Sequence, residues 1–347
     1  MTLSTLKAAV IGVGSMGRNH ARVYRELEET QLVAVADSSD AARTRTARDN
    51  MVKGYADYRQ MLEEAQPDVV SIVVPTEEHH QVALEAMEAG CDVLVEKPIA
   101  ATVAQALEMI ACAHRLGRKL MVGHIVRFDA AVQQLQQRLA SGELGRVFEV
   151  RSRRLGPFPA RIRDVGVIID LATHDLDITS YVTGQPIVRV YAETERRIHS
   201  CHEDILAGTV RLQDGTIGLL DINWLTPAKI RELTVTGEKG MFLVDYMTQD
   251  LYYYENQDAV PIAWDSLSML KGVSEGRMIR YPVAKTEPLK VELQAFACSV
   301  IHDTPTPVTG EDGVAALSAA LALVQSGAEH RSIDIQPMNG MATCSRN

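Results

Sequence analysis

A glycine-rich turn near the N-terminus constrains the fold of this chain more than any other feature. The motif Gly12-Val13-Gly14-Ser15-Met16-Gly17 directly follows an apolar run at residues 6–11 and opens a helical pattern over residues 15–27. In a dinucleotide-binding turn the first glycine permits the turn, the second admits a pyrophosphate, and the third lets the helix pack on the strand. The unpaired N–H groups of the helix N-terminus favour the negative charge of such a phosphate. Because glycine-rich turns are common, the motif needs support from its surroundings.

A second apolar run supplies that support. It covers residues 32–36 and ends at Asp37, the twentieth residue after Gly17, where an acid can bind both hydroxyls of an adenosine ribose. The same carboxylate would repel a 2′-phosphate, so Asp37 predicts NAD as the cofactor, with NADP less favoured. Arg43 could soften this preference. The alternative interpretation of Asp37 is a helix cap before Ala41.

Helical and strand patterns keep alternating after Asp37. Helices are expected at residues 40–50, 58–65 and 102–116, and strands near Tyr55 and at residues 68–74, 93–95 and 119–122. This alternation predicts an α/β Rossmann domain over residues 1–123, with a doubly wound parallel sheet covered on both faces. Ligands of such sheets bind beyond the carboxyl ends of the strands, where Gly12, Asp37, Thr76 and Lys97 are expected to gather.

The pattern changes to long strands after a helix expected at residues 129–139. Strands are expected at residues 146–155, 188–195, 204–212, 216–223, 231–236 and 241–245, with hairpin signals at Asp214-Gly215 and at Glu238-Lys239-Gly240. Residues 124–336 are therefore predicted to form an α+β domain for substrate binding and oligomerisation, with a large, mostly antiparallel open sheet. Helices, the longest at residues 168–183, are expected to cover one face. Residues 337–347 are predicted to be a flexible tail, and the second sheet face indicates a homodimer or homotetramer.

Composition excludes several classes of partner. A formal charge of −10 argues against binding to nucleic acid or to an anionic membrane. Five scattered cysteines without a C-x-x-C pair are typical of a reducing cytosol, so the expected location is cytoplasmic, and we expect neither a secretory signal nor a transmembrane segment. His199, Cys201 and His202 lack a ligand with tetrahedral spacing elsewhere, so no metal is predicted.

Two segments carry candidate catalytic side chains. Asp170 and His174 are four residues apart on a predicted helix and would share a face, where the carboxylate fixes the imidazole tautomer and raises its basicity. Such a pair can accept a hydroxyl proton near neutral pH. Lys97 follows a predicted strand and could stabilise an alkoxide as a hydride leaves its carbon. The alternatives are a surface ion pair and a plain surface lysine.

The stretch from residue 146 to 163 is strongly basic in this acidic chain. It contains one acid, Glu149, and the six arginines Arg146, Arg151, Arg153, Arg154, Arg161 and Arg163. The planar guanidinium group matches phosphate oxygens well, so the segment predicts a phosphate site. The alternative is that alternate arginines of one strand face solvent or pair with acids across a subunit interface.

Three motifs in this order resemble the Gfo/Idh/MocA oxidoreductase family: the glycine turn, Glu96-Lys97-Pro98, and Asp170-x-x-x-His174-x-x-Asp177. The resemblance covers nearly the whole chain. It implies hydride transfer between a sugar-like alcohol and a nicotinamide cofactor, with Lys97, Asp170 and His174 as the catalytic set. The cofactor contacts expected from the turn and from this resemblance are Gly12, Gly14, Ser15, Met16, Gly17, Asp37, Ser38, Pro75, Thr76, His79, Glu96 and Lys97.

Two further stretches resemble the sugar-nucleotide branch of the family, residues 123–128 and residues 156–167. Ala130 stands where relatives often have proline. The branch implies oxidation at C3 of UDP-N-acetylglucosamine or a related nucleotide sugar. Substrate contacts are then expected from His124, Arg127, Arg154, Arg161, Arg163 and Asp177. The remaining alternatives are an inositol-type free-polyol dehydrogenase, an NAD-dependent glycosidase and a non-catalytic NAD sensor.

Overall fold

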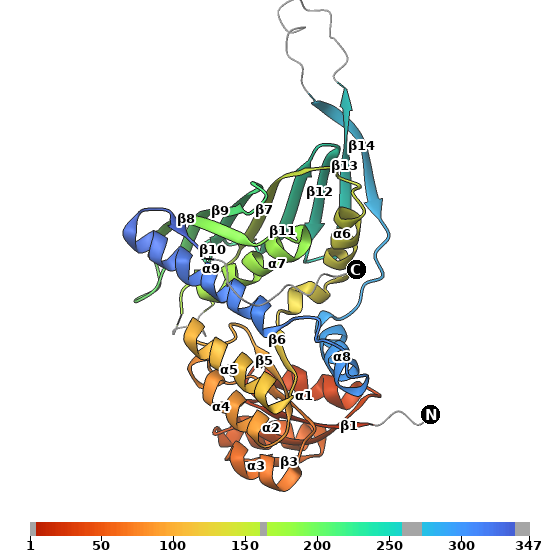
Figure 1. The fold of residues 1–347 in the computed structure, drawn as a ribbon, viewed down its shortest axis with the longest axis vertical. Coiled ribbons are helices and arrows are strands. Elements are labelled where there is room, and N and C mark those ends of the chain that lie inside the picture. Colours follow the sequence, from red (N-terminus) through yellow and green to blue (C-terminus); the bar gives the residue numbers. More distant parts are fainter. Residues whose placement is uncertain (1–4, 160–164, 259–272, 337–347) are drawn as a thin grey trace, which may run out of the picture. The chain divides into compact units, whose positions relative to one another are not determined.

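The computed structural model describes residues 5–159, 165–258 and 273–336. The chain divides into two compact units (Figure 1). The first unit comprises Met1–Asp129 and Thr286–Leu317, and the second comprises Ala130–Lys285 and Ser318–Asn347.

The first unit is built on a six-stranded sheet in the order β3-β2-β1-β4-β5-β6, with every neighbouring pair parallel. All four residues of β4 are buried, as expected for a central strand covered on both faces. The strands are β1 Leu6–Ile11, β2 Thr30–Ala36, β3 Lys53–Tyr55, β4 Val69–Ile72, β5 Asp92–Glu96 and β6 Leu120–Gly123. The strand order reverses between β1 and β4, and the predicted Rossmann sheet is confirmed.

Helices connect these parallel strands. They are α1 Gly17–Glu26, α2 Asp40–Asn50, α3 Tyr58–Ala65, α4 Thr76–Glu88 and α5 Val103–Leu116, followed by the short 3₁₀ helix η1 Ile125–Phe128. Local sequence sets their ends. In α5, Thr102 and Gln105 form a reciprocal capping box at the start, and Gly117 adopts φ 62° at the end.

The chain returns to the first unit after the second sheet. The predicted boundary lay after residue 123, with all of residues 124–336 in the second domain; in the structure the first unit runs to Asp129 and includes Thr286–Leu317. Helix α8, Pro288–Ile301, packs on α1 and η1 and buries Leu293 and Phe296 completely. Figure 1 shows α8, in blue, beside α1, in red. Sequence periodicity shows which helix face is buried but does not identify the partner, so this return was not predicted.

The second unit contains a nine-stranded sheet in the order β14-β13-β12-β11-β7-β10-β9-β8-β15. Only β10 and β7 pair in parallel, so the predicted mostly antiparallel sheet is confirmed. The strands are β7 Val147–Leu155, β8 Ile187–Glu195, β9 Ile205–Leu212, β10 Ile217–Asn223, β11 Ile230–Gly237, β12 Gly240–Asp245, β13 Asp250–Asp258, β14 Val273–Tyr281 and β15 Ile333–Asp334. The last three strands were not predicted.

Helices cover one face of this sheet (Figure 1). They are α6 Ala130–Ala140, the π-helical turn η2 Ile168–Ala172, α7 Thr173–Thr183 and the C-terminal part of α9 Gly310–Glu329. The core beneath them includes Leu176, Ile222, Trp224 and Leu323. Side chains of the opposite face, such as Tyr191 and Leu219, stay half-exposed. No helix within the described ranges is long and apolar enough to cross a bilayer.

Candidate functional site

The glycine turn has the backbone requirements of a dinucleotide site. Gly12 has φ +85°, and a Cβ there would lie 2.5 Å from the carbonyl oxygen of Val73. A Cβ on Gly17 would lie 1.9 Å from the carbonyl oxygen of Gly12. Gly14 is exposed and has nothing within 4 Å of its Cβ position. Gly12 and Gly17 are therefore required for the close packing of the turn. Gly14 leaves open the space in which a pyrophosphate can approach the backbone. Ser15 is also exposed and Met16 is half-buried before α1 begins.

Asp37 is bound directly to this turn. Its Oδ2 accepts the Val13 N–H at 2.7 Å, and its Oδ1 accepts the Ser39 N–H at 2.8 Å. The guanidinium group of Arg43 donates to the Asp37 carbonyl oxygen at 2.8 Å and forms an ion pair with Asp40. The carboxylate is thus fixed beside the turn, and the charge of the nearby arginine is already shared with another acid. Both features fit a dinucleotide with an unmodified ribose, and Ser38 is exposed next to them.

Pro75, Thr76 and Lys97 lie at the same edge of the sheet as the glycine turn, because they follow the carboxyl ends of parallel strands. His79 is 1% exposed, and its ring nitrogens lie 2.9 Å from the Pro98 carbonyl oxygen and 3.0 Å from that of Val74. Burial lowers the pKa of His79, although both carbonyl contacts oppose the shift. The imidazole joins the chain segments that follow β4 and β5; its contact with a cofactor stays a prediction.

A buried hydrogen-bonded chain leads to Glu96, the residue before Lys97. The Tyr24 hydroxyl lies 2.8 Å from Ser71 Oγ, which lies 3.1 Å from His20 Nδ1. His20 Nε2 lies 3.1 Å from Glu96 Oε1, and Glu96 Oε2 accepts the Lys97 N–H at 3.1 Å. Burial is the largest influence on Glu96 and would raise its pKa. The hydrogen bond with His20, the charges of His20 and Lys97 and the Lys97 N–H together hold the pKa below its usual value. This chain fixes the backbone at Lys97, and sequence reasoning missed it; the available signal was a histidine on the buried face of α1.

Glu292 of α8 is a second buried carboxyl in the same unit. It is 0% exposed, and neither of its carboxyl oxygens has a hydrogen-bond partner within the described part of the chain. Burial and the charge of Glu96 raise the pKa of Glu292 well above its usual value. Both causes favour the protonated, uncharged form of this side chain. Nothing in the periodicity of α8 indicated a buried acid.

The segment with Asp170 and His174 begins as a π-helical turn before α7 rather than as the continuous α-helix that was predicted. The Thr173 hydroxyl donates to the Ile169 carbonyl oxygen at 2.9 Å, and the carboxylate of Glu203 accepts the Ile168 N–H at 3.1 Å. Such turns occur often at functional sites. Four residues are close to one turn of either helix, so Asp170 and His174 remain neighbours; both are half-buried, whereas Asp177 is 3% exposed.

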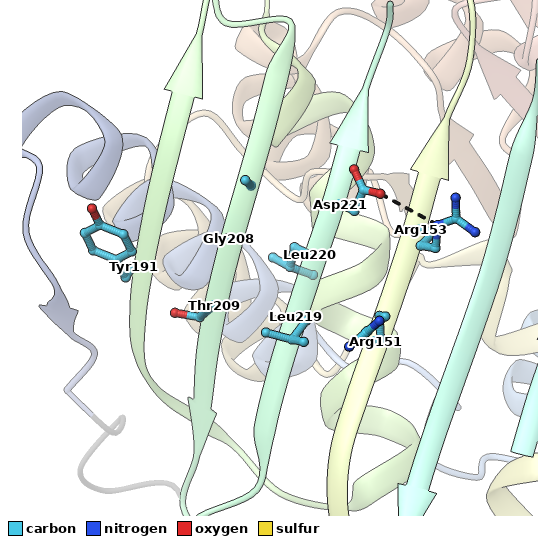
Figure 2. Close-up of a pocket in the computed structure, with 9 residues that line it drawn as sticks. Arg151, Arg153, Tyr191, Gly208, Thr209, Leu219, Leu220 and Asp221 are labelled. Carbon is cyan, nitrogen blue, oxygen red and sulfur yellow. Dashed lines mark ion pairs between the residues drawn. The ribbon is translucent and has the colours of Figure 1, made fainter. Parts of the chain in front are cut away.

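The described arginines of the basic segment do not form one cluster. Successive strand residues face opposite sides of a sheet, so Arg151 and Arg153 of β7 lie on one face and Arg154 on the other. Figure 2 shows Arg151 and Arg153 at one side of a shallow hollow of about 410 Å³, with Leu219 in the middle and Tyr191 and Thr209 at the other side. Three arginines of the segment form ion pairs with acids: Arg146 with Glu238, Arg151 with Glu149, and Arg153 with Asp221 and Glu232. Arg161 and Arg163 lie outside the described residues.

Arg154 is held inside the second unit by a carboxylate. Its Nε and Nη2 donate to the two Asp175 oxygens at 2.7 and 3.0 Å, and both side chains are buried. Two of the three guanidinium nitrogens of Arg154 therefore donate to Asp175. The predicted substrate contact of Arg154 would have to use its remaining N–H groups. Sequence reasoning missed Asp175 and also Arg231, which lies directly opposite Arg154 on β11.

His124 and Arg127 lie in the interior of the first unit. His124 is 1% exposed, and Arg127 is 6% exposed. The Arg127 guanidinium lies 3.1 Å from the Asp312 carboxylate at the start of α9. Burial would raise the pKa of Asp312, but Arg127 and the hydrogen bonds from Thr309 together lower it. The pair joins η1 to α9, so Arg127 has a structural contact here, and substrate contacts of both residues stay predictions. Across the described ranges, no group of three or more His, Cys, Asp or Glu side chains could hold a metal ion.

Comparisons with known proteins agree with this geometry. The family described as "Oxidoreductase family, NAD-binding Rossmann fold" matches residues 6–124, and the "GFO/IDH/MocA C-terminal domain" matches residues 132–243. UDP-N-acetylglucosamine 3-dehydrogenase of Acidithiobacillus ferrooxidans is 30% identical over 91% of this chain and 95% of that protein. D-glucoside 3-dehydrogenase of Escherichia coli is 33% identical over 69% of this chain and 77% of that protein.

Solved structures share the fold over nearly the whole chain. The Acidithiobacillus ferrooxidans enzyme has a TM-score of 0.82 at 29% identity and covers 93% of this chain and 97% of its own. The scyllo-inositol dehydrogenase of Lactobacillus casei, solved with NAD(H) and scyllo-inositol, has a TM-score of 0.79 at 22% identity and covers 95% and 99% of the two chains. At that identity the second likeness supports the fold alone.

Proposed function

The chain belongs to the Gfo/Idh/MocA oxidoreductase family, and on that premise we propose that it is an NAD-dependent dehydrogenase of a sugar secondary hydroxyl. The preferred substrate is UDP-N-acetylglucosamine or a related nucleotide sugar, oxidised at C3. The observation that carries the proposal is the open glycine turn with the Asp37 carboxylate bound to Val13, in a chain whose 30%-identical relative is a 3-dehydrogenase.

Three side chains perform the chemistry in this proposal. Bound NAD supplies the hydride acceptor. His174, oriented by Asp170, accepts the proton of the substrate hydroxyl. The Lys97 ammonium stabilises the negative charge that develops on the substrate oxygen. The chain from Tyr24 to Glu96 supports this role because it fixes the backbone on which Lys97 stands.

A free glucoside or polyol is the second candidate substrate. One observation favours it: the described arginines of the basic segment are paired with acids, which leaves few of them for a diphosphate. The similarity to a D-glucoside 3-dehydrogenase points the same way. Competition by UDP separates the candidates, because UDP inhibits oxidation only where the substrate site accepts a nucleotide.

A substrate panel tests the proposal. The protein is assayed for NADH formation with UDP-N-acetylglucosamine, UDP-N-acetylgalactosamine, a methyl glucoside and myo-inositol, each with NAD and with NADP. Steady NADH formation with a UDP sugar, faster with NAD, is the expected result. Glycoside cleavage without net NADH formation would instead indicate a glycosidase, and cofactor binding without turnover of any compound would indicate a sensor.

Cytoplasmic location and self-association complete the proposal. The scattered cysteines fit a reducing compartment. Half-exposed Tyr191, Leu219, Leu243 and Tyr252 lie on the sheet face that the helices do not cover, and we propose that this face pairs in a homodimer or homotetramer. Light scattering of wild type and Leu219→Asp tests the pairing; a wild-type monomer would disprove it.

A further inference from the structure

A pair of arginines lies across two neighbouring strands of the second unit. Arg154 of β7 and Arg231 of β11 are directly opposite in the antiparallel register, on the face that the helices cover. Opposite residues of such strands have neighbouring side chains, and two like charges there destabilise the sheet. Asp175 neutralises Arg154 through two hydrogen bonds. Among the residues that the structure describes, no acid forms such an ion pair with Arg231.

The contacts of Arg231 leave its charge poorly compensated. Its Nη1 donates to the carbonyl oxygens of Leu155 and Ile230 at 2.8 and 3.1 Å. Within the described ranges, no carboxylate oxygen lies within 4.0 Å of its guanidinium nitrogens. Burial and the charge of Arg154 lower the pKa of Arg231 to about 10, although Asp175 and Asp170 act in the opposite direction. The group is still a cation at neutral pH, in a half-buried position that disfavours its charge.

Arg231 lies beside a second basic side chain and near the candidate catalytic segment. A Cβ on Gly156 would lie 3.9 Å from Arg231 Nη2 and 4.0 Å from Lys229 Cγ, so the glycine borders both basic side chains. Asp170 acts electrostatically on both Arg231 and Arg154, which places the arginines near the residue proposed to orient His174. Arg151 and Arg153 lie on the other face of the sheet.

We propose that Arg231, assisted by Lys229, binds phosphoryl oxygens of the substrate and selects nucleotide-linked sugars over neutral ones. The inference rests on the proposed function and names the residue that gives it its substrate class. A guanidinium group offers a planar pair of donors that matches two phosphoryl oxygens, and a bound anion would relieve the repulsion from Arg154. Arg154 then acts as a positioning residue that Asp175 holds in place.

Three variants test the assignment. Arg231→Gln removes the charge, Arg231→Lys keeps it without the planar fork, and Arg153→Gln is the matched control on the opposite face of the sheet. For each, calorimetry measures the Kd of UDP without NAD, and steady-state kinetics measure kcat and KM for a UDP sugar and for a neutral glucoside. Arg231→Gln is expected to raise the Kd of UDP and the KM of the UDP sugar about tenfold or more, with kcat changed less than about threefold.

The controls distinguish this inference from the proposed function. Arg231→Lys is expected to bind UDP with intermediate affinity, and Arg153→Gln as well as wild type. The melting temperature of Arg231→Gln should not fall, because the substitution removes a repelled charge; if it does fall, Arg231→Lys alone decides the question. Tight UDP binding by Arg231→Gln would overturn the assignment even if UDP sugars are oxidised. UDP binding that depends on Arg231, without oxidation of any UDP sugar, would uphold the anion site and overturn the proposed function.

Discussion

In the proposed enzyme, the Asp37 carboxylate binds the adenosine ribose of the cofactor and selects NAD over NADP. Its carboxylate is fixed by the N–H groups of Val13 and Ser39. A 2′-phosphate would bring a second negative charge to this carboxylate, whereas two ribose hydroxyls could donate hydrogen bonds to it. The charge of Arg43 is shared with Asp40, so it offsets Asp37 only in part.

Asp37→Ser is therefore expected to lower kcat/KM for NAD about tenfold or more and to raise kcat/KM for NADP relative to NAD. The measurement is the ratio of the two kcat/KM values with one sugar substrate. Asp49→Asn is a control on the surface of α2, where Asp49 forms ion pairs with Arg45 and Arg48. An unchanged ratio in Asp37→Ser would remove Asp37 from cofactor selection.

His79 gives a pH-dependent contribution to stability. Because burial lowers its pKa in the folded chain, the unfolded chain binds more protons near and below its own pKa of about 6.5. The contribution is therefore complete above about pH 6.5 and is lost as the pH falls toward the lowered folded value. His79→Gln should have a lower free energy of unfolding than wild type at pH 8, with a smaller difference at pH 5. Urea unfolding at both pH values measures this, and a difference independent of pH would contradict it.

Packing between elements explains where the sequence was informative and where it failed. Strands β7 to β12 were located to within one residue or so, because alternating burial and hairpin glycines are local signals. The same alternation places Arg153 and Arg154 on opposite faces of the sheet. Counting arginines along the sequence therefore overestimated how many of them can lie together at one phosphate site. Strand pairing also placed Arg231 opposite Arg154, a relation that no local pattern contains.

The packing of α8 against α1 contains a buried acid that can be tested. Glu292→Met removes two carboxyl oxygens that lack hydrogen-bond partners in the described part of the chain, and it should stabilise the fold by about 1–3 kcal/mol at pH 7. Since the folded pKa is raised, the contribution of Glu292 to stability is complete below about pH 4.3 and is lost as the pH rises. The gain should therefore be smaller at pH 5 than at pH 7. A destabilised variant at pH 7 would show that Glu292 has a polar role.

At the scale of the whole molecule, sequence motifs predicted both sheets and the family, but not how the chain is shared between the units. Residues 286–317 return to the first unit, where α8 packs on α1 and η1 and the start of α9 meets Val122 and Ile99. The periodicity of a helix shows which face is apolar, but it does not show against which element that face packs. The candidate catalytic residues could be proposed from sequence because their motifs are short and ordered. The contacts of His20, Asp175 and Arg231 are made only in the folded chain, so no local pattern indicated them.

The central claim is that this chain moves a hydride from C3 of a sugar to NAD with the help of His174 and Lys97. The most direct measurement uses UDP-N-acetylglucosamine carrying deuterium at C3, with mass spectrometry of the reduced cofactor. The account predicts one deuterium in NADH, slower transfer than with unlabelled substrate, and kcat lowered about 100-fold or more by His174→Ala. NADH without deuterium, or full turnover by His174→Ala, would contradict it.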